Sequence, residues 1–314
     1  MSDNTSEPGA PTAKGAAESS ERVASTQVSR PNSVLSAAKQ IDHTILRLNK
    51  LLASPGGLSA FLSTFNYSLY LLAYIQTKSP AIANHARKLL ALVKQQPFKP
   101  ETVTLVAAGA TPSLATLAVI ISRARTTLRL FGLFPLYAWL RTLLAGAKPG
   151  ADPVLHRIAL TQCLSYFTYQ ALENICFLTD NGVLSPRVVA LLNRGESTTA
   201  RVYLWAYRAW LGGVSCDFLR LAREAQLENR RRVVRANLQS QGKAVAEYQD
   251  EEDKKFDSRW WTDIMIASAW MPMALHFSSG TTGLPGWNLG WMGICGLFAG
   301  SSRAQGLWRA TLHP

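Results

Sequence analysis

The chain has 314 residues, of which 47% are apolar and 17% are charged, and 33 basic residues against 20 acidic residues give it a net charge of +13. Soluble domains carry about 25% charged residues, so this composition is unusual for a soluble domain. The arginines stand at the edges of apolar segments, as Arg123, Arg129, Arg141 and Arg303 do, and not among interleaved aromatic residues. That placement excludes a typical nucleic-acid stripe and favours a phospholipid membrane surface as the partner of the basic chain.

The sequence lacks the residue patterns of catalytic, cofactor and metal sites. It has no nucleophile elbow, phosphate-binding loop or dinucleotide fingerprint, and its five histidines are scattered. The four cysteines form no C-x-x-C pair and have no histidine at ligand spacing. We therefore expect no enzymatic activity, no catalytic residue and no bound cofactor or metal. The thiols are expected to be buried.

The first 32 residues are rich in Ser, Ala, Glu and Pro and have almost no large apolar side chains. Such a segment buries too little surface to order itself, so residues 1–32 are predicted to be a disordered tail. Helical periodicity begins next, where Asn32 or Ser33 can cap a helix. Gly56 and Gly57 are expected to end this helix.

Residues 58–75 predict an amphipathic helix that carries no charge. Its polar face consists of hydroxyl and amide groups, from Ser59, Ser63, Asn66 and three tyrosines, and the opposite arc of about 100° is apolar. Three interpretations follow: a helix that inserts into one leaflet, a core helix of a bundle, and a short transmembrane helix. The residues assigned to membrane insertion are Leu58, Phe61, Leu62, Phe65, Leu69 and Leu72.

The segment from residue 33 to residue 222 is predicted to be a helical, membrane-associated region. Residues 102–122 are uncharged over the length of one bilayer crossing and form a possible span. Residues 158–178 are apolar but contain Glu173. Because an unpaired carboxylate is costly in lipid, this segment is predicted to be a packed helix in which Glu173 pairs with an arginine.

Residues 223–258 are strongly polar. They contain the triplet Arg230-Arg231-Arg232 and a run of four acidic and two basic residues from Asp250 to Lys255. Both signs of charge in one block are typical of a solvated helix or a linker, and nucleic-acid binding is not expected here.

The last fifty residues are the most distinctive part of the chain. Residues 264–302 contain no charged side chain, and glycines and a proline near residue 283 divide the terminal region, 264–314, into two apolar pieces. The second piece, about residues 287–307, is predicted to be a membrane anchor. Its glycines share about one third of the helix circumference, which allows close helix–helix packing and predicts self-association. They are Gly286, Gly290, Gly293, Gly296 and Gly300.

Several segments, taken in their order along the chain, resemble the peroxin-eleven family. They are SRARTTLRLFGL from Ser122, YQALEN from Tyr169, RAWL from Arg208, and the ending from Leu289 to Trp308. The resemblance covers about residues 33–310, and the sequence is most similar to the divergent fungal C-type branch of that family.

The resemblance implies an all-α, helical integral membrane protein of the peroxisomal membrane, with amphipathic helices and a C-terminal glycine-rich transmembrane segment. It implies elongation of the organelle ahead of fission, control of peroxisome number and size, homo-oligomers, cytosolic termini and recruitment of fission factors. Family members usually place Lys and Arg in the inserting helix, whereas residues 58–75 have none. Insertion is therefore expected to depend on apolar wedging.

Two alternatives remain open at this point. One is a metabolite pore in the same membrane, which would need polar side chains facing a lumen between helices. The other is a helical adaptor that recruits fission factors without entering the membrane. Conductance in planar bilayers tests the pore, and extraction with carbonate tests the adaptor.

Overall fold

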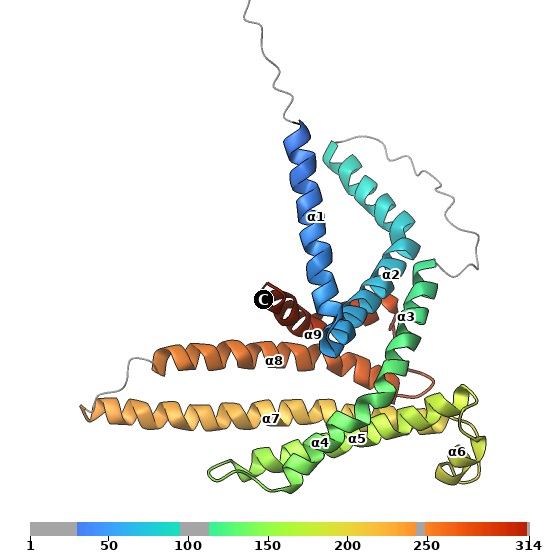
Figure 1. Ribbon diagram of the computed structural model, residues 1–314. Coiled ribbons are helices and arrows are strands. Elements are labelled where there is room, and N and C mark those ends of the chain that lie inside the picture. Colours follow the sequence, from blue (N-terminus) through green and yellow to red (C-terminus); the bar gives the residue numbers. More distant parts are fainter. Residues whose placement is uncertain (1–29, 95–112, 243–248, 313–314) are drawn as a thin grey trace, which may run out of the picture. The chain divides into compact units, whose positions relative to one another are not determined.

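A computed structural model describes residues 30–94, 113–242 and 249–312 of the chain. Every regular element in these ranges is a helix, as Figure 1 shows, which confirms the predicted all-α class. Residues 1–29 of the predicted tail and residues 102–112 of the possible span lie outside the described residues.

The elements follow one another in a simple order. They are α1 (Arg30–Leu52), α2 (Pro55–Lys94), α3 (Ser113–Arg129), a short 3-10 helix η1 (Leu130–Gly132), α4 (Leu133–Leu144), α5 (Pro153–Asp180), α6 (Pro186–Leu192), α7 (Ala200–Ser240), α8 (Gln249–Ser278) and α9 (Leu289–Ala310). The chain divides into two compact units, residues 1–46 and residues 47–314. The first unit contributes the N-terminal part of α1, on which Leu35, Ile41 and Ile45 are exposed.

The joint between α1 and α2 differs from the sequence expectation. Gly56 and Gly57 do not end α1; they lie in the first turn of α2, and the break falls at Ala53 and Ser54. Pro55 suits the first position of a helix because its missing N–H has no partner there in any case. The Ser54 hydroxyl oxygen then accepts a hydrogen bond from the Gly57 N–H at 3.0 Å, so this serine caps the new helix.

Helices α5, α7 and α8 pack side by side in the second unit, each antiparallel to the next. A glycine permits the closest approach of α5 and α7, because a Cβ at Gly213 would collide with the Tyr166 ring. Beside it, the Gln162 side chain donates to the Gly213 carbonyl at 3.1 Å. Nearer the α6 end of these helices, Cys176, Val189 and Val202 form a buried apolar cluster.

Helix α2 packs antiparallel to α9 and also contacts α3. Tyr67 from α2, Met273 from α8 and Cys295 from α9 form the second buried cluster. The Tyr67 ring meets the Trp270 ring edge to face, with centroids 6.3 Å apart. Helices that are remote in the sequence therefore share one core.

Candidate functional site

Helix α2 buries two side chains of its polar face. Asn66 is only 1% exposed and Tyr67 only 7% exposed. The Asn66 amide donates to the Ala118 carbonyl at 2.6 Å and accepts from Arg125 at 3.0 Å when its oxygen and nitrogen are assigned from the surrounding donors and acceptors. Arg125 also donates to the Ser63 hydroxyl at 3.0 Å and lies 5.0 Å from the Tyr67 ring centroid. The middle of the polar face of α2 thus contacts α3.

The apolar arc of α2 is divided between the core and the surface. Leu69 is buried, whereas Phe65 and Leu72 are 38% and 50% exposed. Leu58, Phe61 and Leu62 are half-buried, and the rings of Phe61 and Phe65 stack with centroids 5.9 Å apart. The six residues assigned to membrane insertion therefore do not form one uniform face, because Leu69 belongs to the core. The exposed arc continues at Ile75, which is 43% exposed.

Three of the five stripe glycines form the contact surface between α9 and α2. Cβ atoms at Gly290 and Gly296 would meet the rings of Tyr74 and Tyr67, and one at Gly293 would lie 2.7 Å from the Leu71 nitrogen. Gly286 and Gly300 are different, since no atom of the described residues lies within 4 Å of a Cβ built at either. The stripe packs against this chain's own α2, and the pattern alone did not reveal which helix would occupy it.

The opposite face of α9 is apolar and exposed. Trp291, Ile294 and Phe298 are 54%, 38% and 59% exposed. Other exposed apolar side chains of the second unit include Leu117, Val119, Ile120, Phe131, Phe134, Trp261 and Met265. Large apolar surfaces of this kind mark contact with protein or membrane. The sequence placed Trp291, Ile294 and Phe298 in the predicted anchor and Leu117, Val119 and Ile120 in the possible span, but it did not single out these side chains as exposed.

Within the described ranges, one helical segment is long and apolar enough to cross a bilayer, and it is Pro55–Lys78. Helix α9, the predicted anchor, does not reach that apolar content. The apolar content of α9 therefore does not support the predicted glycine-rich transmembrane segment at the C-terminus. The α2 segment is long and apolar enough to enter lipid.

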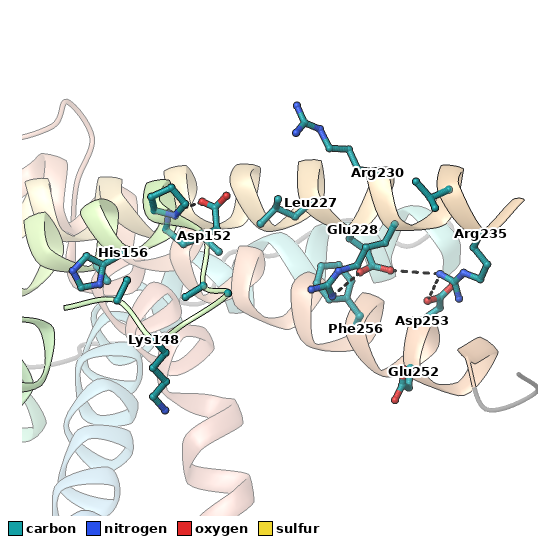
Figure 2. A pocket seen from close by; sticks show the side chains of 18 of the residues that line it. Lys148, Asp152, His156, Leu227, Glu228, Arg230, Arg235, Glu252, Asp253 and Phe256 are labelled. Atoms are coloured by element: carbon teal, nitrogen blue, oxygen red, sulfur yellow. Dashed lines mark hydrogen bonds and ion pairs between the residues drawn. The ribbon is translucent and has the colours of Figure 1, made fainter. Parts of the chain in front are cut away.

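The described residues of the charged block, 223–242 and 249–258, lie on α7 with its C-terminal end and on α8, and several of their charges pair between the two helices. A cavity of about 1600 Å³ lies beside these residues and is lined by parts of α7 and α8 and by the loop before α5. Figure 2 shows side chains that line it. Glu228 accepts from Arg232 at 3.1 Å, and Asp253 accepts from Arg235 at 3.0 Å. The third arginine of the triplet is thus already engaged by acidic side chains.

Asp152 connects the start of α5 to α7. Its carboxylate caps α5 by accepting from the Val154 and Leu155 N–H groups, and it forms an ion pair with Arg223 at 2.7 Å. The Arg223 hydrogen bond, helped by the Leu155 N–H, lowers the pKa of Asp152 to about 2. Asp152 also lines the cavity that Figure 2 shows.

Glu173 has the arginine partner that the sequence predicts. Its Oε1 accepts from Arg129 Nη2 at 3.0 Å and from the Tyr169 hydroxyl at 2.8 Å. The carboxylate is buried on α5, and Arg129 reaches it from the end of α3. No group of three or more His, Cys, Asp and Glu side chains that could hold a metal occurs in the described part of the chain.

A protein-family model described as Peroxisomal biogenesis factor 11 (PEX11) matches residues 82–298. The match begins in the second half of α2 and ends inside α9, so it covers well over half of the 314 residues. The insertion residues of α2 precede it. Neither a search of curated proteins nor a search of solved structures found a match.

Proposed function

This chain belongs to the peroxisomal biogenesis factor 11 family, and we propose that it remodels and elongates the peroxisomal membrane ahead of organelle fission. Proteins of this family are peroxisomal membrane proteins that take part in peroxisome proliferation. The observation that carries the proposal is the polarity of α2. Asn66 and Tyr67 point into the protein while Phe65 and Leu72 are exposed, an arrangement that suits a helix whose outer face meets lipid.

In this mechanism the exposed arc of α2 acts as a wedge. Apolar side chains that enter one leaflet occupy area among the headgroups of that leaflet and not of the other, which favours curvature. Each fully buried large apolar side chain contributes about 1.5–3 kcal/mol. Phe65, Leu72 and Ile75 together would therefore contribute several kcal/mol without any basic side chain between residues 58 and 75.

Helix α9 would enlarge the wedge. Its glycines bring it against α2, so its exposed residues Trp291, Ile294 and Phe298 move with α2 as one body. Tryptophan favours the interface between headgroups and acyl chains. We assign membrane contact to the α2–α9 pair, in place of a separate C-terminal anchor.

Self-association and recruitment of fission factors complete the proposal. Because Gly290, Gly293 and Gly296 already pack against α2, we assign self-association to a surface of the chain other than the glycine stripe. Wedges held together in this way would act on the same patch of membrane. Dependence on local protein density follows from weak helix–helix contacts, which are worth about 1 kcal/mol or less in lipid.

Reconstitution of the full chain into liposomes tests the wedge. The double variant Phe65→Asp with Leu72→Asp should abolish tubulation seen by electron microscopy, because each carboxylate would have to enter the apolar region. Leu191→Asp is the matched control, since Leu191 is 86% exposed on α6 and has no part in the proposal. Tubulation by the α2 double variant at the level of the control would contradict the wedge.

A metabolite pore is the second candidate function, and one observation favours it. A cavity of about 950 Å³ lies in the second unit and is lined by arginine, tyrosine and glutamate side chains, the polar lining that a conduit requires. Planar-bilayer recordings of the purified chain test this function. Single-channel current steps whose size changes in Glu173→Gln would support the pore. Absence of any current steps would contradict it.

A further inference from the structure

The cavity of about 950 Å³ carries an inference that goes beyond membrane elongation. It is enclosed by residues of α2, α3, α5, α7, α8 and α9, all within the second unit. Its lining combines arginine side chains from α3, an acidic pair from α5 and a wall of aromatic rings. Cavities with a few convergent polar groups in an aromatic frame are the usual form of a ligand site.

The acidic part of the cavity holds polar atoms that lack partners. Glu173 is only 4% exposed, and Arg129 and Tyr169 both bind its Oε1. Its other oxygen, Oε2, and the Arg129 Nε are buried without a hydrogen-bond partner among the described residues. Burying a charged group's atom without a partner is costly. One acceptor and one donor are therefore available at the same place.

Tyr169 remains a donor in this group. Burial raises the pKa of Tyr169 well above its ordinary value; the Arg129 charge opposes this and the Glu173 carboxylate reinforces it. The phenol thus keeps its proton on the hydrogen bond to Glu173 Oε1. Glu173 Oε2 is left as the acceptor for an incoming cation.

The basic part of the cavity comes from α3. Arg125 is held by Ser63 and the Tyr67 ring, as described above. The Arg123 side chain makes no hydrogen bond or ion pair with any residue that the structure describes, and it lines the same cavity. Together with Arg129 it offers guanidinium groups for an anion. Guanidinium groups match the geometry of phosphate oxygens well.

The remaining wall is aromatic and continuous. The rings of Tyr203 and Tyr207 stack at 6.1 Å, Tyr207 lies 5.2 Å from Phe277, and Trp210 lies 5.9 Å from Trp270. Aromatic faces attract ammonium groups and are the usual recognition surface for quaternary ammonium. A cation placed against this wall can also meet Glu173.

We propose that this cavity binds a phosphodiester that carries an ammonium group, supplied by the headgroup of a zwitterionic membrane phospholipid. The phosphate would contact Arg123 and Arg129, and the ammonium group would contact Glu173 Oε2 and the tyrosine wall. The apolar lip of the cavity indicates the lipid as the source. Val119 lines the cavity and is 46% exposed, and its neighbour Ile120 is 57% exposed, so acyl chains can lie along α3.

Native mass spectrometry of the full chain released from nanodiscs tests the site. The nanodiscs contain equal amounts of phosphatidylcholine and phosphatidylglycerol, which share the phosphodiester and differ in the ammonium group. The wild-type chain should retain phosphatidylcholine in preference. Arg123→Gln should lower its retention about tenfold, the size expected from one charge-assisted hydrogen bond. Arg187→Gln, an exposed arginine on α6 outside the cavity, should not change it.

Glu173→Gln separates recognition from packing. Glutamine keeps the size of the side chain and an oxygen for Arg129 but loses the charge that attracts ammonium, so preference should shift from phosphatidylcholine toward phosphatidylglycerol. Unchanged retention in Arg123→Gln, or an unchanged lipid preference in Glu173→Gln, overturns the proposal. Arg123→Gln alone decides the matter if Glu173→Gln does not fold.

Lipid-free protein with glycerophosphocholine as the probe distinguishes the two sources. If glycerophosphocholine binds the wild-type protein and this binding is lost in Arg123→Gln, the site recognises the same chemistry in a soluble ligand. If glycerophosphocholine does not bind while phosphatidylcholine is retained from nanodiscs, the ligand is the lipid. The lipid site and the membrane wedge are tested independently. Arg123→Gln leaves the exposed arc of α2 unchanged, and the α2 double variant leaves the cavity residues unchanged.

Discussion

Gly293 of α9 lies so close to Leu71 of α2 that a Cβ on the glycine would stand 2.7 Å from both the backbone nitrogen and the Cβ of the leucine. The neighbouring atoms include backbone, which cannot rotate away as a side chain can. The two helices approach at this point because position 293 has no side chain. The membrane-contact proposal depends on this pairing.

Gly293→Ala should destabilise the protein by about 1–3 kcal/mol, the usual cost of overpacking a core. Alanine stabilises a helix relative to glycine by about 1 kcal/mol. The measured loss of stability is therefore smaller than the cost of the steric clash itself. Thermal unfolding in detergent measures it. Gly300→Ala is the control, because no described atom lies within 4 Å of a Cβ there, and it should be neutral or stabilising. Equal effects at the two positions would contradict the packing.

The Asp152–Arg223 pair should make stability depend on pH at the acid end. Asp152 has its pKa lowered from 3.8 to about 2, so the folded state holds the charged form more strongly than the unfolded state does. Its stabilising effect is complete above about pH 4 and is lost as pH falls toward 2. Denaturant midpoints measured across this window for Asp152→Asn should lose that part of the pH dependence.

Asparagine suits the test at position 152 because it caps helices as well as aspartate does. The N-cap of α5 is therefore kept while the charge is removed. Asp250→Asn, at an exposed acid in the first turn of α8, serves as the matched control. A wild-type pH profile from Asp152→Asn would show that the ion pair does not contribute.

The four cysteines should resist alkylation in the folded protein. All are buried, and burial, followed by the charges of Asp180 and Glu173, raises the pKa of Cys176 to about 12. The reactive thiolate is therefore scarce at pH 8. Intact-mass analysis after maleimide treatment should show almost no adduct until denaturant is added, and then four. Rapid labelling without denaturant would mean that the helices open readily.

Trp291 should contact acyl chains if the outward face of α9 meets the membrane. It is 54% exposed next to Ile294 and Phe298 on that helix. Brominated lipids quench only nearby indoles, so Trp291→Phe should reduce the quenched fraction of the total fluorescence. Trp205→Phe, at a half-buried position on α7 beside the Cys176 cluster, should leave that fraction unchanged or raise it. The opposite pattern would place α9 away from lipid.

Sequence periodicity was enough to predict the all-α class, whereas the roles of the apolar arc of α2 and of the glycine stripe remain proposals. It could not predict which face of α2 would be covered. That depends on Arg125, which reaches from α3 to Ser63 and Asn66, and periodicity within one helix does not show which other helix will contact it. Leu69 likewise shares the apolar arc with Phe65 but is buried by its neighbours.

The stripe illustrates the same limit. Glycine at helical spacing indicates that something approaches closely, and it carries no information about whether the partner is another copy or another helix of the same chain. An ion pair for Glu173 could be predicted from the sequence, because a buried carboxylate needs a cation. Only the fold identifies that cation as Arg129. The unpaired Oε2 of Glu173 has no counterpart in the sequence at all.

The joint at the end of α1 bears on how synthesis proceeds. Arg47 donates to the Trp308 carbonyl at 2.9 Å and lies 4.1 Å from the centre of its ring, and its contact with Thr311 joins residues 264 positions apart. A ribosome shields the newest few dozen residues, so α2 emerges long before α9 exists to cover it. Tyr67 and Tyr74, whose rings pack against the glycines of α9, stay uncovered until α9 has been made. Membrane entry by the α2–α9 pair would therefore follow the synthesis of α9, and a nascent chain stalled before α9 should expose a helix that requires a chaperone.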